Sequence, residues 1–433
     1  MAEKVVVEFD QHSKEYQQRG MEIGAEIRAK CPVAWSENYG GYWIITGLEE
    51  ASAIYKRPEM FSALNLTWKD PDSMYKGIQI PNNAAYGENS FLEMDPPEQL
   101  QFRRALNSHL SPAAVVRWEP FAREFTNACV DEIIEKGEGD FVEDIVNVVP
   151  AVLTMAMIGF PMSEWEIFCE PVHAQVYTPA HSPDRERVNQ ISIEMGMRTM
   201  QLIDQTRKNP RPGMCKDLID AEIQGKKLED ASIAGQLGLV IGGGFDTTTA
   251  LTSNAFQWLY ENQAEKARLL EFNDELWATA TEEFLRFFSP SQGDARTAIE
   301  DCEFLGVEFK KGDRVLPSFS ISNRDPKFFD NPDVLDIERF PNRHAAFGLG
   351  NHRCIGSNLA RMNFRTMLQE TLKRIPEYTV DVSGVERYET IGIINGNKTM
   401  PFTFPKGAKT GPGLNATIEK WQKILDDEAA AAS

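Results

Sequence analysis

One cysteine near the C-terminal end of the chain stands in a loop punctuated by glycines, directly before a helical pattern. The loop reads Phe-Gly-Leu-Gly-Asn-His-Arg-Cys-Ile-Gly, residues 347–356. Apolar residues recur at helical spacing over residues 357–375, which predicts a helix that begins just after Cys354. The N-terminus of a helix favours a thiolate, and glycines let the backbone approach a flat, bulky group closely. The loop alone also allows a buried cysteine before an ordinary helix.

Composition describes a large globular protein with a substantial core. The 433 residues are 42% hydrophobic and 25% charged. With 45 basic and 65 acidic residues the net charge is −20, which disfavours nucleic acid and anionic membranes as partners. The six cysteines include no Cys-x-x-Cys pair, and this scatter is typical of reduced thiols in a cytoplasmic protein.

No segment has the length and hydropathy expected of a signal peptide or a membrane anchor. The N-terminal residues lack a long apolar stretch, and the most apolar run, residues 148–160, contains Pro150 and is too short to span a bilayer. We therefore expect this run to be a buried helix, and we expect no membrane partner.

Helical patterns dominate the chain. The predicted helices cover residues 98–110, 120–136, 228–262, 274–288 and 355–375. Strand-like segments are few and short: residues 42–46, 304–309, 314–317 and 400–404, with 310–313 as a hairpin turn between two of them. The sequence therefore predicts a mainly α fold with a small β region.

The longest helical pattern contains Gly242-Gly243-Gly244, followed by Phe-Asp-Thr-Thr-Thr. Each glycine inside a helix costs about 1 kcal/mol relative to alanine. The segment is either a loop between two helices, or a helix loosened where a hydroxyl can bond the carbonyl one turn earlier. The residues alone leave both interpretations open.

The cysteine loop, Phe-x-x-Gly-x-His-x-Cys-x-Gly, resembles the haem-thiolate loop of the cytochrome P450 family. The resemblance extends over nearly the whole chain, from Asp95 to about Pro401. It implies that Cys354 is the axial ligand of haem iron. It also implies that Phe347 packs beneath the haem, that Gly348 and Gly356 belong to the cofactor loop, and that His352 reaches a propionate.

The resemblance implies the triangular single-domain fold of this family over residues 1–409. A tail, residues 410–433, is partly helical in pattern and expected to fray. The implied cofactor is haem b, with O2 as co-substrate and electrons from NAD(P)H through a reductase and an acidic ferredoxin.

The glycine segment is similar to the oxygen-binding motif of the same family, Gly-x-Asp-Thr-Thr. On that match Gly243 leaves room for dioxygen, Asp246 relays protons, and Thr247 is the alcohol that acts beside the bound oxygen. Glu283 and Arg286 resemble the Glu-x-x-Arg pair of the family, and Arg339 stands where its third, structural member is expected.

Other positions match haem-contacting segments of the family. Arg296 and Arg103 are expected to pair with haem propionates, which would be charge-assisted contacts. Gln99 stands where many relatives have histidine; it can donate a hydrogen bond but brings no charge.

The arginines near the cysteine predict a basic patch for the ferredoxin, although the residues alone also allow arginines scattered over the surface. The predicted patch consists of Arg103, Arg104, Arg343, Arg353 and Arg361.

The segments that resemble the substrate pocket are mostly apolar with a few polar groups. They point to a hydrophobic small molecule such as a terpenoid, a fatty acid or a steroid. The predicted contacts are Tyr86, Val240, Gly244, Gln292 and Ile394.

The resemblance implies a monooxygenase. A peroxygenase driven by hydrogen peroxide is the nearest alternative, and the Asp246-Thr247 pair argues against it. A haem-binding sensor or carrier without turnover is a second alternative, and the same pair argues against that. A third has Cys354 as a nucleophile with His352, but two residues apart is poor geometry for a base and a nucleophile.

Overall fold

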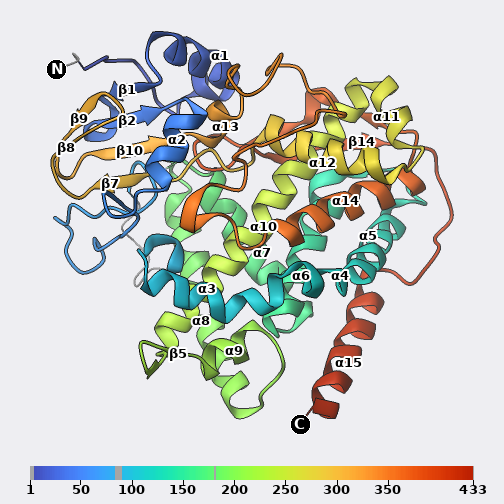
Figure 1. Cartoon of the computed structure of the whole chain (residues 1–433). Helices are drawn as coiled ribbons and strands as arrows, with labels where there is room; N and C mark the ends of the chain where they lie inside the picture. The colour runs from blue at the N-terminus through green and yellow to red at the C-terminus, as the bar shows by residue number, and fades with distance from the viewer. Residues whose placement is uncertain (1–3, 83–89, 180–181, 433) are drawn as a thin grey trace. The chain divides into compact units, whose positions relative to one another are not determined.

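The computed structural model describes residues 4–82, 90–179 and 182–432 (Figure 1). The chain forms two compact units, each built from segments distant in sequence. The sheet unit comprises Met1–Arg104, Glu282–Ile355 and Thr390–Asn395, and the helical unit comprises Ala105–Thr281, Gly356–Glu389 and Gly396–Ser433. Two helices, α3 (Glu98–Leu110) and α12 (Asp274–Phe288), pass from one unit into the other.

The sheet unit is built around a five-stranded sheet in the order β1-β2-β10-β7-β3. All its neighbours pair antiparallel except β10 and β2, which are parallel. The strands are β1 (Val33–Ser36), β2 (Tyr42–Ile45), β3 (Phe61–Ser62), β7 (Arg296–Ala298) and β10 (Arg314–Pro317). Trp43, Val315 and Phe309 pack in its core, and three helices accompany the sheet: α1 (Lys14–Lys30), α2 (Leu48–Tyr55) and α13 (Phe319–Ser322).

One strand prediction is wrong in detail. The segment 304–309 is not one strand: β8 (Cys302–Phe304) and β9 (Val307–Phe309) form a hairpin. Leu305 and Gly306 have φ values of 54° and 77°, as a tight hairpin turn requires. Residues 310–313 do turn the chain, but β10 then pairs with β2 and β7 rather than with β9.

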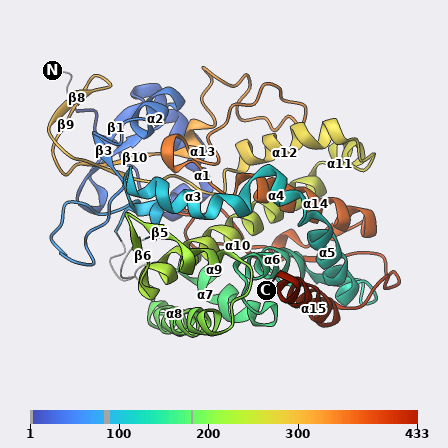
Figure 2. The same cartoon turned by 60° about the horizontal axis from the view of Figure 1, so that its bottom comes forward.

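The helical unit contains most of the helices. They are α4 (Pro112–Val116), α5 (Glu119–Ile133), α6 (Val148–Ile158), α7 (Trp165–Tyr177), α8 (Arg185–Lys208), α9 (Met214–Asp220), α10 (Asp230–Glu261), α11 (Gln263–Leu269), α14 (Ser357–Arg374) and α15 (Leu414–Ala432). Helix α10 contacts α6, α7, α8 and α14, so it is the central helix of this unit (Figure 2). A small sheet joins β4 (Glu138–Asp140), β14 (Pro401–Thr403) and β11 (Thr379–Val380).

The most apolar run of the sequence forms helix α6. Every residue from Val148 to Ile158 is buried, which confirms the prediction of a buried helix. Within the described ranges, no helix is long and apolar enough to cross a membrane.

Helix α10 runs through the glycine segment without interruption, so the loop interpretation of this segment is wrong. The Thr247 hydroxyl donates to the Gly243 carbonyl oxygen at 2.9 Å, one turn earlier. Packing against the neighbouring helices offsets the low helix propensity of the glycines, because tertiary contacts rather than propensity stabilise most protein helices.

The C-terminal segment forms a helix as far as Ala432, where fraying was expected. Thr417 and Ile418 are buried, and the Trp421 ring lies 4.9 Å from the ring of Phe121 on α5. The Trp421 indole N–H also donates to Glu124 at 3.0 Å. These contacts with α5 explain why the helix is retained.

Candidate functional site

The loop at residues 347–356, called the cysteine loop here, is closed by a backbone hydrogen bond. The Cys354 N–H donates to the Phe347 carbonyl oxygen at 2.7 Å. Gly350 has a φ of 66°, and a side chain there would place its Cβ 2.4 Å from the Tyr55 carbonyl oxygen. Cys354 is exposed within the described structure and lies three residues before Ser357, the first residue of α14. The loop therefore presents a thiol near a helix N-terminus, where the thiolate is favoured.

Helix α3 braces the cysteine loop. The Gln99 side-chain amide donates to the Asn351 carbonyl oxygen at 2.9 Å, and the Arg103 guanidinium donates to the Arg353 carbonyl oxygen at 2.7 Å. Burial lowers the pKa of Arg103, and the charge of Cys354 opposes that effect. Gln99 stands at a position predicted to bind the cofactor, and its side-chain N–H satisfies a backbone carbonyl group of the loop.

A polar cradle is formed at the loop by two guanidinium groups, those of Arg103 and Arg296, and by the His352 ring of the loop itself. Burial, and then the charges of Arg296 and Arg103, lower the pKa of His352 to about 3. Neither ring nitrogen of His352 has a hydrogen-bond partner within the described ranges, although both atoms are buried. The Arg296 guanidinium is buried over the Tyr55 ring, 4.7 Å from its centroid. The single N–H of a neutral, unpartnered imidazole next to two guanidinium groups fits an anionic group such as a haem propionate.

The predicted structural trio comes together in the sheet unit. Glu283 and Arg286 are both fully buried, and their side chains form two hydrogen bonds of 2.7 Å. Arg339 donates to both oxygens of Glu283 at 3.1 Å. Burial raises the pKa of Glu283. Its hydrogen bonds to Arg286, the Asp336 N–H and Arg339 lower the pKa by more, so it lies below its usual value.

In the helical unit, Asp246 is completely buried in α10. One of its oxygens accepts hydrogen bonds from the His173 ring of α7 and, at 2.5 Å, from the Tyr388 hydroxyl. Sequence reasoning missed both partners, because neither lies in a motif. The one available signal was a histidine in the apolar part of α7, since a buried histidine needs a polar partner.

The predicted substrate contacts differ in burial and surroundings. Tyr86 lies outside the described residues. Val240 is partly exposed and Ile394 buried. A Cβ at Gly244 would lie 2.7 Å from the Thr154 hydroxyl of α6, so its small size serves helix packing. A Cβ at Gly243 would meet nothing within 4 Å in the described structure, so that side of α10 is open.

Gln292 was also predicted to contact the substrate, but it is buried and its amide is used internally. It accepts from the Tyr16 hydroxyl at 3.1 Å and donates to the Ser289 carbonyl oxygen at 2.8 Å. A polar group in an apolar segment needs such partners, which sequence reasoning could not assign.

The predicted basic patch is only partly assembled within one unit. Arg103 and Arg353 are linked by the bond described above, and Arg104, Arg343 and Arg353 are exposed. Arg361 belongs to the helical unit, where its guanidinium donates to the Ser357 carbonyl oxygen at 3.2 Å.

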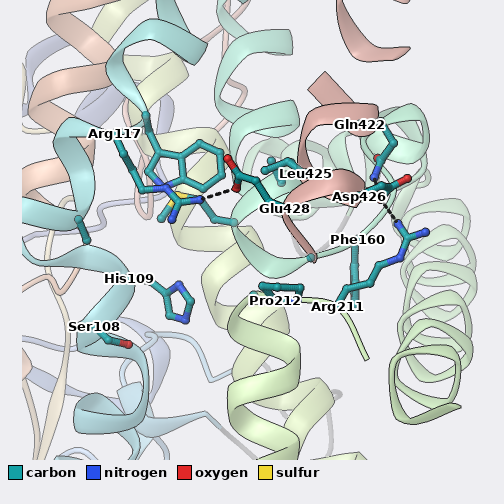
Figure 3. A pocket seen from close by; sticks show the side chains of 16 residues that line it. Ser108, His109, Arg117, Phe160, Arg211, Pro212, Gln422, Leu425, Asp426 and Glu428 are labelled. Atoms are coloured by element: carbon teal, nitrogen blue, oxygen red, sulfur yellow. Dashed lines mark hydrogen bonds and ion pairs between the residues drawn. The ribbon is translucent and has the colours of Figure 1, made fainter. Parts of the chain in front are cut away.

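A cavity of about 140 Å³ lies in the helical unit, next to α15 (Figure 3). Its charged side chains already pair: Arg211 with Asp426 at 3.0 Å and Arg117 with Glu428 at 3.7 Å. None of the predicted site residues lines it in the described structure. It is therefore not the candidate active site.

Comparisons with known proteins agree with the cysteine loop. The sequence model of the family described as Cytochrome P450 matches residues 18–280 and 275–387. The polyketide biosynthesis cytochrome P450 PksS of Bacillus subtilis (strain 168) is 26% identical over 405 residues, covering 92% of this chain and 99% of the relative. Linalool 8-monooxygenase of Pseudomonas putida is 28% identical over 390 residues, covering 89% and 95%.

A solved structure of similar fold is Mycobacterium marinum cytochrome P450 CYP268A2 in complex with pseudoionone. Its TM-score is 0.83 at 26% identity, over 93% of this chain and 100% of that one. The family match covers most of the chain, and the fold agrees with it. The chain belongs to the cytochrome P450 family and is a monooxygenase.

Proposed function

We propose that this monooxygenase inserts one atom of O2 into a hydrophobic small molecule, with haem iron bound by Cys354 and electrons delivered from NAD(P)H through a reductase and an acidic ferredoxin. The single observation that carries the proposal is the cysteine loop, which presents Cys354 beside a cradle of buried cationic and unpartnered groups. When bound there, haem supplies the oxygen-activating chemistry.

The chain's own residues bind and orient the cofactor. Cys354 supplies the thiolate, and Phe347, Gly348 and Gly356 shape the loop around it. Arg103, Arg296 and His352 would hold the acidic side chains of haem by charge-assisted hydrogen bonds. The hydrogen bonds of Gln99 and Arg103 to loop carbonyls keep the thiol in place.

Two residues of α10 would transfer protons during the reaction. Asp246 supplies an acidic group and Thr247 a partly exposed hydroxyl one residue later. This pair supports a reaction with O2, which consumes protons, over a peroxygenase reaction, which starts from hydrogen peroxide. It also supports turnover over a role as sensor or carrier.

The substrate class rests on the apolar segments of the chain and on its relatives. One relative is named for linalool and another structure holds pseudoionone, both small and largely apolar. A terpenoid, fatty acid or steroid fits this chain, and a cytoplasmic location fits its six free cysteines.

Isotope labelling tests the proposal. Purified protein, ferredoxin, reductase, NADH or NADPH and a panel of terpenes, fatty acids and steroids are incubated under ¹⁸O2, after screening the panel for displacement of iron-bound water in the absorption spectrum. We expect one ¹⁸O atom in the product and dependence on the electron donors. Product formed only with hydrogen peroxide, without NAD(P)H, would identify a peroxygenase instead.

A further inference from the structure

The two predicted proton-handling residues of α10 face different environments. Adjacent residues in a helix point about 100° apart around its axis, since 3.6 residues make one turn. Thr247 is partly exposed and bonds to Gly243, whereas Asp246 is completely buried against α7 and the chain around Tyr388. Asp246 therefore does not face solvent, and the residues packed around it determine how it can exchange a proton.

Two donors converge on one oxygen of Asp246. His173 Nδ1 and the Tyr388 hydroxyl both bond to Oδ1. His173 is 7% exposed and Tyr388 1% exposed. Tyr388 is fixed in place because Gly396 leaves room for its ring: a Cβ at Gly396 would lie 2.7 Å from that ring. Its ring also contacts Tyr177, with centroids 5.5 Å apart.

Charge favours a protonated His173 opposite a carboxylate. Burial lowers the pKa of His173, but the charges of Cys169 and Asp246 and a hydrogen bond to Asp246 raise it, with a net rise from 6.5 to about 10. Burial and Asp246 raise the pKa of Tyr388 well above its usual value, so it remains a neutral donor. The titratable groups that act on this cluster are Cys169, Tyr177, Asp246, Tyr388 and Glu143. They lie on α7, on α10, in the segment after β12 (Glu386–Arg387) and on the π-helical turn η3 (Val142–Val146).

The second oxygen of Asp246 is left without a bond. Neither Asp246 Oδ2 nor His173 Nε2 has a hydrogen-bond partner in the described part of the chain, although both atoms are buried. A buried, unsatisfied polar atom costs about 1–3 kcal/mol, and more when it is charged. A buried polar atom without a partner calls for an explanation, such as a catalytic role or an ordered water. At a carboxylate oxygen, a water molecule that carries a proton would supply the missing hydrogen bond.

We infer that His173 and Tyr388 are positioning residues for the proton step: they hold the Asp246 side chain through Oδ1 and leave Oδ2 as the atom that takes up a proton and releases it. A water molecule delivers a proton to Oδ2 and regains one from bulk solvent; Oδ2 then releases its proton toward the oxygen that is reduced, so Asp246 returns to the carboxylate. His173 keeps both ring protons throughout. This inference rests on the proposed function of Asp246.

The stability of the pair follows from the sign of the shift. Because the folded pKa of His173 lies above its ordinary 6.5, the pair stabilises the fold fully below pH 6.5 and loses this contribution as the pH rises through about 10. The cluster should therefore remain charged over the whole neutral range, and turnover should show no titration from it there.

The direct test is the charge state of His173. Nitrogen-15 NMR of histidine-labelled holoprotein, in its diamagnetic reduced and carbon-monoxide-bound form, reports ring protonation for each of the six histidines. The His173 signal is the one lost in His173→Gln. We expect a doubly protonated ring at about pH 8, where an ordinary histidine is neutral. A signal that titrates near the ordinary value would overturn the inference, whether or not the enzyme turns over.

Kinetics supply the second test. His173→Gln keeps a neutral donor beside Asp246 but removes the positive charge of the imidazolium. We expect product formation to slow about tenfold near neutral pH and to acquire a new pH dependence there. In an Asp246→Asn background, His173→Gln should cost less than about twofold more, because the two residues act as one unit. If the effects of His173→Gln and Asp246→Asn on the rate multiply and the pH profile is unchanged, His173 has only a structural role.

Control variants keep these outcomes interpretable. Tyr388→Phe keeps the ring beside Tyr177 and removes one bond to Asp246, so it replaces His173→Gln if that variant does not fold. It should also slow product formation, but leave the pH profile flat because the His173 charge remains. His109→Gln breaks a different histidine–aspartate pair of the helical unit, with Asp217 at 2.6 Å, and should change neither rate nor profile. A native enzyme without a thiolate haem spectrum would instead contradict the proposed function.

Discussion

Thr247 makes a hydrogen bond within its own helix and can still accept another. Its hydroxyl donates to the carbonyl oxygen of Gly243 at 2.9 Å, which satisfies the hydroxyl within α10 while leaving its oxygen lone pairs open. The neighbouring Gly243 is open in the described structure, so a small ligand could approach this hydroxyl. The residue needs no movement of the helix to act as a hydrogen-bond partner.

We predict that Thr247→Ala still consumes NAD(P)H but yields hydrogen peroxide in place of product, because the oxygen species loses its hydrogen-bond partner. The fraction of electrons recovered in product should fall by about tenfold or more. Thr247→Ser retains the hydroxyl and should restore coupling. Quantifying NAD(P)H, peroxide and product in parallel gives the ratio; equal coupling in the alanine variant would remove this role from Thr247.

Sequence motifs were enough to select Cys354, Asp246 and Thr247 as candidates, because each stands in a contiguous pattern with fixed spacing. They could not predict His173 and Tyr388, which reach Asp246 from positions 73 and 142 residues away along the chain. Such partners depend on tertiary packing. The same reason explains Gln292, a polar residue whose partner, Tyr16, is 276 residues distant.

At the level of elements, α12 is anchored by its buried acid. Glu283 receives bonds from Arg286, Arg339, the Asn342 amide and the Asp336 N–H. Arg286 also donates to the carbonyl oxygens of Asn323, Pro332 and Val334. The cluster thus joins α12 to the irregular segment that leads to the cysteine loop, and no titratable proton is needed for this structural role.

We predict that Glu283→Ala destabilises the fold by about 3–5 kcal/mol, because it leaves buried guanidinium charges uncompensated. The yield of folded, haem-loaded protein should fall. Glu275→Ala, at an exposed position of the same helix, should change stability by less than about 0.5 kcal/mol. Haem content and unfolding midpoint measure both; a fully loaded but inactive Glu283→Ala protein would argue against a structural role.

The same cluster predicts a pH dependence. Since the net pKa of folded Glu283 lies below its ordinary 4.5, the contribution of Glu283 is fully present above pH 4.5 and declines as the pH falls through the folded value. The stability difference between the native protein and Glu283→Ala should therefore shrink in acid. A difference that stays constant down to about pH 3 would contradict the lowered pKa.

Predictions of helices and strands were correct for a long apolar run and wrong where the pairing of strands determines the structure. The buried helix α6 followed from an unbroken apolar run. The β8–β9 hairpin was missed because six residues, 304–309, have strand-like composition on both sides of Leu305 and Gly306, and only the left-handed backbone of these two reveals the turn. The continuity of α10 could not be predicted, since it depends on packing with helices distant in sequence, such as α6 and α14.

For the whole molecule, the negative net charge is the property that most affects the docking of a redox partner. A net charge of −20 should repel an acidic ferredoxin, unless positive charge is concentrated where electrons enter. Arg104 and Arg353 are exposed in the sheet unit, and Arg353 is next to Cys354 in sequence. Association steered by such residues is screened by salt over about 10 Å at 0.1 M ionic strength.

We predict that Arg104→Glu slows reduction by the ferredoxin roughly tenfold at low salt and leaves substrate binding unchanged. Lys310→Glu makes the same change of charge at the turn after β9 and serves as the control. Reduction rates measured against ionic strength should fall for the native protein and be nearly flat for Arg104→Glu. An unaffected variant with no salt dependence would show that docking uses another surface.

The central claim is that Cys354 binds haem iron, and one spectrum tests it. The reduced, carbon-monoxide-bound native protein should show the strongly red-shifted Soret band of a thiolate-ligated haem. Cys302→Ser, at a partly exposed cysteine of the sheet unit, should keep this band, and Cys354→Ser should lose it. A Cys354→Ser protein that retains the band would show that another residue binds the iron, and the account of this site would be wrong.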